Sequence, residues 1–148
     1  MYIVPTVGPG PVAIVRIFSD TGAEETAGFT EPDVPPSAAL AVGERAVLLG
    51  PADPTNFRFN IGFLSLGFAT ATQMTVTARS SDGTLLKSVS VGVGVLHQES
   101  AASFFRMDLE PNMSFTVEVM SGALIAYGVT ADNRTNDMSF QLARRIGG

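Results

Sequence analysis

The feature that most constrains this chain is a two-residue alternation of apolar and polar side chains. From 57 to 63, three phenylalanines and an isoleucine occupy the odd positions, with arginine, asparagine and glycine between them. The same period recurs at 74–79, 114–119 and 138–142. Successive side chains of a strand point to opposite faces, so this period indicates half-buried β-strands rather than helices. The chain is therefore predicted to be mainly β.

Three further segments, 12–18, 46–49 and 124–129, are largely apolar on both faces and are predicted as central strands or as strands covered on both sides. Asp82-Gly83 and Ser121-Gly122 each predict a tight hairpin. Helical composition is confined to 98–105, where at most two turns fit. About eight strands with almost no helix predict an all-β fold, an antiparallel two-layer sandwich. The residues predicted to lie inside it are Phe59, Ile61, Val76, Val117, Val119 and Phe140.

A length of 148 residues suits one domain. Residues 1–11 are broken by proline and glycine and are predicted to form an extended amino-terminal arm, with residues 12–146 forming the single sandwich domain. The connection from 20 to 43 is unusually long for a compact domain. Gly28-Phe29-Thr30 is predicted as a short edge strand inside it.

Composition excludes several classes of protein. The chain has no cysteine, so disulfide scaffolds, cysteine zinc sites and thiol nucleophiles are excluded. Its net charge of -5 and single lysine, Lys87, argue against nucleic acid and against an anionic membrane surface. No apolar run approaches the ~20 residues of a membrane span, and no signal peptide is recognised at the start.

Five segments share an order and chemistry with a known module: VRIF at 15–18, AVGERAVLLG at 41–50, FRFNIGFLSLG at 57–67, the hairpin at 76–86, and AYGVTADNRTNDMSF at 126–140. In this order they resemble an immunoglobulin-like β-sandwich of bacterial secreted and cell-surface proteins, often appended to exported peptidases. Met138 departs from that pattern, where proline is common. The resemblance implies an immunoglobulin-like fold, an extracellular or cell-surface location and no catalytic residues.

The single histidine, His97, is the one candidate for acid–base chemistry of the kind that a hydrolase needs. As a general base it requires a serine nucleophile and an orienting carboxylate nearby. No Gly-x-Ser-x-Gly motif is present, so the alternative is a surface or capping histidine.

The densest polar cluster is Asp132-Asn133-Arg134-Thr135-Asn136-Asp137. Its carboxylate and amide oxygens make Asp132, Asn133, Asn136 and Asp137 candidate Ca²⁺ ligands. The EF-hand spacing is missing, and a turn held by Asx hydrogen bonds is favoured instead.

Arg58 and Asn60 lie opposite the aromatic side of their strand and are candidate contacts for a ligand or partner. Alternatively, Arg58 pairs with a carboxylate and Asn60 satisfies nearby backbone groups. Carbohydrate-binding sandwiches use such faces but present tryptophan or tyrosine, and this chain has no Trp and two Tyr. Phe104 and Phe105 are adjacent in a polar segment, so one is predicted to cap the sandwich and the other to be available for a partner.

Together these features predict a non-catalytic interaction or assembly module of a bacterial extracellular or cell-surface protein, with no cofactor. The expected partner is a protein, including a second copy reached through strand edges or through the amino-terminal arm. No nucleic acid and no membrane insertion are expected. The alternatives are a carbohydrate-binding module with a glycan ligand, and a small hydrolase that uses His97.

Overall fold

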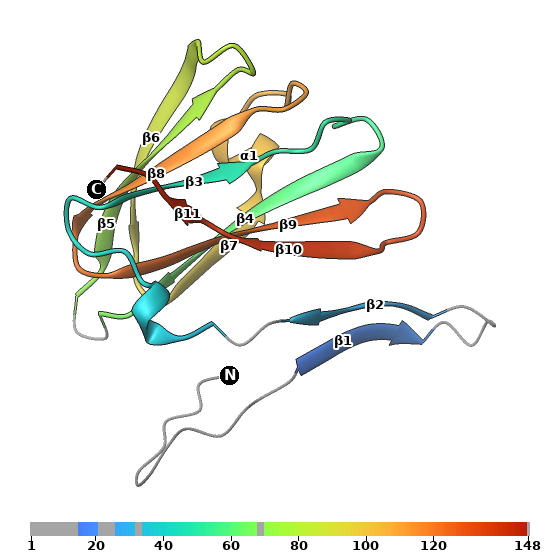
Figure 1. The fold of residues 1–148 in the computed structure, drawn as a ribbon, viewed down its shortest axis with the longest axis horizontal. Coiled ribbons are helices and arrows are strands. Elements are labelled where there is room, and N and C mark those ends of the chain that lie inside the picture. The colour runs from blue at the N-terminus through green and yellow to red at the C-terminus, as the bar shows by residue number, and fades with distance from the viewer. Residues whose placement is uncertain (1–14, 21–25, 32–33, 68–69, 148) are drawn as a thin grey trace, which may run out of the picture.

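The computed structural model describes residues 15–20, 26–31, 34–67 and 70–147, with side chains from residue 34 onward (Figure 1). Helix in these ranges is limited to the 3-10 turn η1 (Pro36–Ala38) and to α1 (Ala101–Phe105), which lies inside the segment predicted from composition. The strands are β1 (Val15–Asp20), β2 (Thr26–Glu31), β3 (Arg45–Leu49), β4 (Phe57–Ser65), β5 (Thr72–Arg79), β6 (Leu85–Val93), β7 (Leu96–Ser100), β8 (Ser114–Ser121), β9 (Leu124–Asp132), β10 (Met138–Leu142) and β11 (Arg144–Arg145).

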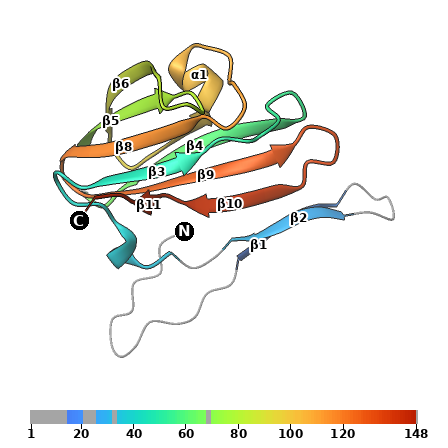
Figure 2. The same cartoon turned by 45° about the horizontal axis from the view of Figure 1, so that its top comes forward.

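Nine of these strands form two antiparallel sheets that stack as a sandwich (Figures 1 and 2). The four-stranded sheet has the order β10-β9-β4-β7, and the five-stranded sheet has the order β11-β3-β8-β5-β6. The chain passes between the sheets from β6 to β7 at one margin and from β10 to β11 at the other. The all-β, two-layer architecture predicted from the alternation is confirmed.

The core lies between the sheets and is built from alternate residues of the central strands. Phe59, Ile61 and Phe63 of β4 are fully buried. The Phe115 ring of β8 stacks on Phe59 at a centroid distance of 5.5 Å and on Phe105 at 5.4 Å. Such pairs add about 0.5–1.5 kcal/mol each beyond the area that they bury. The predicted interior residues that are confirmed are Phe59, Ile61, Val76, Val117 and Val119.

A glutamine side chain closes the seam between β10 and β3. Gln141 of β10 donates from Nε2 to the Leu49 backbone oxygen at 2.7 Å, and its Oε1 accepts from the Leu49 N–H at 3.0 Å. The short strand β11 pairs with β3 only at Ala46 and Val47, so it stops before Leu49. The amide of Gln141 therefore supplies the donor and acceptor that the next residue of a neighbouring strand would supply.

Some sequence predictions are corrected by the sheet order. Phe140 is half-buried on the side of its sheet that faces away from the core, because the register of β10 pairs it with Val129 rather than with an inward residue. The segment 12–18 is not a central strand: its described part lies in β1, which pairs only with β2, the strand predicted at 28–30. Residues 46–49 lie in β3, which is flanked by β11 and β8 as a central strand should be, but they are buried on one face only.

The two predicted hairpins have different outcomes. The Asp82-Gly83 turn joins β5 to β6 as predicted, and Gly83 adopts a φ of 89° that favours glycine. The Ser121-Gly122 hairpin prediction is wrong, because β8 and β9 belong to different sheets and the turn carries the chain between them. Turn chemistry marks a reversal, and it does not say which sheet the next strand joins.

Candidate functional site

The face of the four-stranded sheet that points away from the core is unusually apolar for the solvent side of an antiparallel sheet. We call it the outer face. Its apolar members are Leu64, Leu96, Ile125, Tyr127, Val129, Ala131, Met138, Phe140 and Leu142. Ile125, Val129 and Ala131 are between 1% and 7% exposed although they lie outside the main core cluster. The molecule therefore carries a second apolar layer beside its core.

Two aromatic rings lie side by side at the centre of the outer face. Tyr127 of β9 and Phe140 of β10 stack with centroids 5.5 Å apart and an angle of 23° between the rings. The Tyr127 ring lies across β4 at Gly62, where an added Cβ would fall 2.1 Å from Tyr127 Cζ. Its hydroxyl donates to Gln98 Oε1 of β7 at 2.6 Å. Together, Phe140, Tyr127, Gly62 and Gln98 span all four strands of the sheet.

Arg58 lies at one end of this face and is held by neutral oxygens. Its Nη2 donates to Asn136 Oδ1 at 2.8 Å, and its Nη1 donates to Asn133 Oδ1 and to the Asp132 backbone oxygen, both at 3.4 Å. Within the described ranges no carboxylate lies within ion-pair distance of this guanidinium, so the predicted pairing of Arg58 with a carboxylate is not found. Asn60 is half-buried on the same face, in register with Ser100 and Val129.

The Asp132–Asp137 segment forms a turn held by its own side chains. Asp132 Oδ1 accepts the backbone N–H groups of Thr135 at 3.0 Å and Arg134 at 2.7 Å, and these two bonds lower the pKa of the Asp132 carboxyl. Asp137 Oδ2 accepts the Thr135 hydroxyl at 3.0 Å. No cluster of three or more His, Asp and Glu side chains in the described part of the chain is placed to hold a metal. This geometry is that of an Asx-stabilised turn, and the cation that touches both of its asparagine amides is Arg58.

A small cleft opens beside Arg58, between the loop before β4, α1 and the loop that follows α1. Its volume is about 270 Å³, and Phe57, Ser100 and Asp108 are among the residues that line it. This volume lies just below the ~300–1,000 Å³ range typical of small-molecule sites. Arg58 therefore borders both this cleft and the outer face.

His97 and the phenylalanine pair of α1 lie on the core side of the same sheet. His97 Nε2 and Glu99 Oε1 are 2.8 Å apart, and the imidazole ring contacts Phe63 and Phe104 at centroid distances of 6.4 and 6.0 Å. No serine hydroxyl among the described residues is hydrogen-bonded to this histidine. Phe104 and Phe105 are both buried, so the prediction that one of them is available to a partner is wrong. The N-cap at Ser100, whose hydroxyl accepts the Ser103 N–H, starts a turn that packs both rings into the core.

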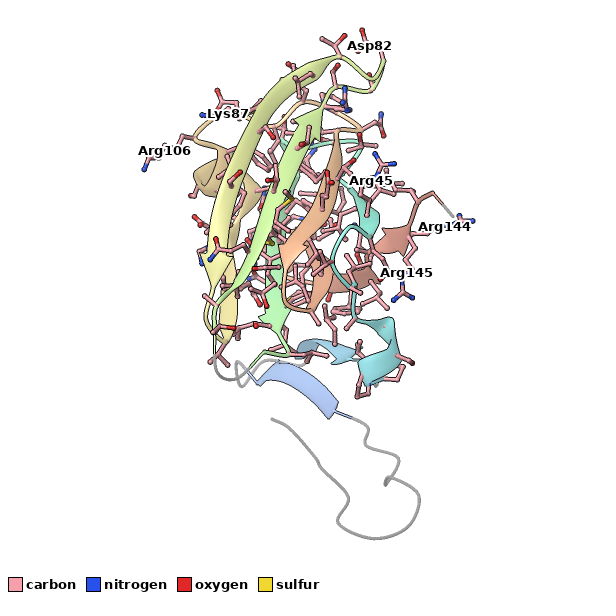
Figure 3. The ribbon with its side chains drawn as sticks, turned by 90° about the vertical axis from the view of Figure 1, so that its left-hand side faces the viewer. Arg45, Asp82, Lys87, Arg106, Arg144 and Arg145 are labelled. Atoms are coloured by element: carbon pink, nitrogen blue, oxygen red, sulfur yellow. The ribbon has the colours of Figure 1, made fainter. Side chains whose placement is uncertain are left out.

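The margins of the two sheets differ in charge. Figure 3 shows Lys87 on β6 at one margin of the five-stranded sheet, with Arg144 and Arg145 of β11 at the other. In the four-stranded sheet, β7 carries His97 and Glu99. The remaining edge strand, β10, contains no ionisable residue.

Exposed apolar side chains also mark β10. Met138 is 36% exposed and Leu142 is 39% exposed. The hairpin β1–β2 runs beside this strand, with β2 nearer to β10 and β1 beyond it (Figures 1 and 2). The hairpin nevertheless forms its own two-stranded sheet and does not join the β10 ladder. The outer face and the β10 edge thus form one continuous surface.

Comparison with known proteins gives no assignment: no family model, no curated protein and no solved structure matches this chain. Among the described residues, no helix has the length and apolar character that crossing a membrane requires. Any functional conclusion therefore rests on the surface just described.

Proposed function

We propose that this chain is a non-catalytic protein-interaction module that binds its partner through the outer face and the adjoining β10 edge. The observation that carries the proposal is the continuity of that surface: a stacked aromatic pair, exposed aliphatic side chains and a strand edge free of charge. Contiguous apolar surface bordered by polar groups marks interaction sites in soluble proteins. Here Arg58, Asn60 and Gln98 supply the polar border.

The absence of catalysis and of a cofactor is part of the same proposal. His97 is paired with Glu99 and packed against aromatic rings, and no nucleophile adjoins it in the described part of the chain. An extracellular or cell-surface location in a bacterium follows from the resemblance to exported sandwich modules. A chain without cysteine is compatible with an oxidising compartment because it has no thiol to oxidise.

The test is affinity capture with the full chain and two matched lysine variants. Leu142→Lys places a charge on the exposed β10 edge, whereas Ser90→Lys places the same charge on exposed β6 of the other sheet. We expect the wild type and the Ser90→Lys variant to retain a protein from cell-envelope extract, and the Leu142→Lys variant to lose it. Retention by all three proteins contradicts the proposal, as does hydrolase turnover that the His97→Ala substitution abolishes.

Glycan binding is the second candidate, and the flat pair of Tyr127 and Phe140 favours it. Sugar rings stack on aromatic faces, and Asn60 and Gln98 flank the pair with amide groups suited to hydroxyls. A glycan array distinguishes the two functions. Binding that Tyr127→Ala abolishes and Leu142→Lys leaves intact supports the glycan ligand over the protein partner.

A further inference from the structure

The cleft beside Arg58 has walls of two kinds. Two ionisable side chains of opposite sign, Arg58 and Asp108, line it. Its apolar lining comes from the loop before β4, from β4 itself, from α1 and from the loop after α1, and consists of Pro54, Phe57, Phe59, Ala102 and Leu109. Apolar walls with a few polar groups are the usual composition of a small-molecule site. Here the polar groups include one full charge of each sign.

Arg58 is a cation without a counter-ion. Its side chain is half-buried, and within the described ranges it makes no ion pair. A guanidinium carries more N–H donors than its three hydrogen bonds, to Asn136, Asn133 and the Asp132 backbone oxygen, can use. The Nε–H has no acceptor among the described residues. A partly desolvated charge gains from an opposite charge, and the planar fork of arginine matches a carboxylate.

Asp108 supplies the opposite charge on another wall of the cleft. It is exposed in the loop that follows α1. Among the described residues its carboxylate has no hydrogen-bond or ion-pair partner, and it does not pair with Arg58 although both side chains line the cleft. A carboxylate at this position attracts an ammonium group and repels a second carboxylate. A ligand that carries both charges therefore fits these walls better than an anion or a cation alone.

The size of the cleft limits the ligand. Its volume of about 270 Å³ corresponds to about nine water molecules, at ~30 Å³ for each in the liquid. A ligand that replaces those waters has a similar number of non-hydrogen atoms. Leucine has this size, and it joins a carboxylate, an ammonium group and an aliphatic side chain at one carbon.

We propose that this cleft binds a free aliphatic α-amino acid. The ligand places its carboxylate on the Arg58 guanidinium, its ammonium group on Asp108 and its side chain against Phe57 and Leu109. Each end of the ligand supplies the charge that the facing side chain lacks. The inference goes beyond the proposed function, because it concerns a small molecule and not the protein partner of the outer face.

The experiment is a titration of the full chain with three probes, followed by heteronuclear NMR. The probes are leucine, leucinamide, which lacks the carboxylate, and N-acetyl-leucine, which lacks the ammonium group. The wild type should bind leucine about tenfold or more tightly than either analogue, because each analogue leaves one charged wall of the cleft without its hydrogen-bonded partner. The amide signals of Phe57, Ser100 and Leu109 should move on addition of leucine, since these residues line the cleft.

Two variants separate the charged walls. Asp108→Asn changes an exposed side chain without a partner in the described structure, so it should fold as the wild type. It should lose the preference for leucine over N-acetyl-leucine and keep the preference over leucinamide. Arg58→Gln should show the reverse, with circular dichroism as the check on folding. Glu110→Gln is the matched control, because this exposed carboxylate lies two residues from Asp108 and does not line the cleft.

Three results overturn the inference. One is a wild type that does not bind leucine with a Kd tighter than about 10 mM. Another is equal binding of leucine and N-acetyl-leucine to the wild type, which assigns the cleft to a carboxylate alone, such as the end of a peptide. The third is an unchanged preference in Asp108→Asn, or the same loss in Glu110→Gln. Partner capture that depends on Leu142 is a separate measurement, so either proposal can fail without the other.

Discussion

Replacing Gly62 by alanine tests the central arrangement of the outer face. The added Cβ would lie 2.1 Å from Tyr127 Cζ and 2.5 Å from its hydroxyl oxygen, so the ring must leave its position across β4. The displaced ring loses its stacking on Phe140, which is worth about 0.5–1.5 kcal/mol. It also loses the hydrogen bond to Gln98, worth about 0.5–1.5 kcal/mol.

Alanine in a strand recovers part of this loss, since glycine there costs roughly 0.5–1 kcal/mol relative to alanine. The expected net destabilisation is therefore about 1 kcal/mol, equivalent to a decrease in Tm of about 2–4 °C for a chain of this length. In a Tyr127→Ala background the collision is gone, and Gly62→Ala should stabilise the protein by about 0.5–1 kcal/mol. The same substitution thus changes sign between the two backgrounds.

The assay is urea unfolding followed by far-UV circular dichroism for the four members of the Gly62–Tyr127 cycle. We expect a coupling free energy of about 1–3 kcal/mol, well above the ~0.3–0.5 kcal/mol scatter of independent sites. Gly94→Ala is the matched control, because a Cβ at Gly94 meets no atom within 4 Å. Equal effects of Gly62→Ala with and without the Tyr127 ring would refute the reasoning.

Three further predictions concern the core, the acid response and the β6 edge. Phe115→Ala should lower the free energy of unfolding by about 3–5 kcal/mol, measured in urea, because this fully buried ring stacks on two others. The hydroxyl of Ser80 and the backbone N–H of Thr84 lower the pKa of Asp82 from 3.8 to about 2, so its stabilising contribution is present above pH ~4 and is lost as pH falls toward 2. The stability difference between the wild type and Asp82→Asn should therefore shrink across that window in acid titrations of urea unfolding. Lys87→Thr should produce concentration-dependent association by light scattering, whereas Lys87→Arg should behave as the wild type, because a charge on an edge strand opposes pairing with another chain.

The fifth prediction concerns metal dependence. Adding EDTA should leave the Tm unchanged, because the oxygens of the Asp132–Asp137 turn are hydrogen-bonded to backbone N–H groups, a hydroxyl and Arg58. A Tm that falls with EDTA and recovers with Ca²⁺ would show that the turn holds a metal.

The sequence predicts the strands of the core better than it predicts their partners. Period-two alternation from 57 to 63 correctly places Phe59, Ile61 and Phe63 inside, because a half-buried strand must separate its two faces. Alternation does not say that β4 pairs with β9, whose residues lie 59 to 75 positions further along the chain than their partners in β4, because that choice depends on how the whole chain closes. For the same reason, the Ser121-Gly122 turn predicts a reversal but not that β8 and β9 join different sheets.

The candidate surface was only partly predictable. Arg58 and Asn60 were singled out by their parity, and both lie on the outer face. Tyr127 and Phe140 were missed as surface residues, because segments that are apolar on both sides do not reveal which side meets the core. The signal was present in 124–129, where alternate residues on both faces are hydrophobic and a central strand with a second covered face is the consistent interpretation.

The two hydrogen bonds between the Gln141 side chain and the Leu49 backbone determine when the fold can close during synthesis. Leu49 leaves the ribosome 92 residues before Gln141, so this margin of β3 stays exposed while those residues are synthesised. At a typical 5–20 residues per second, that interval lasts about 5–20 s. The last strands to be synthesised complete both layers, and a nascent chain stalled before residue 141 should remain open to proteases and chaperones. Emergence of Gln141, rather than emergence of the first strands, sets the earliest moment at which this seam can close.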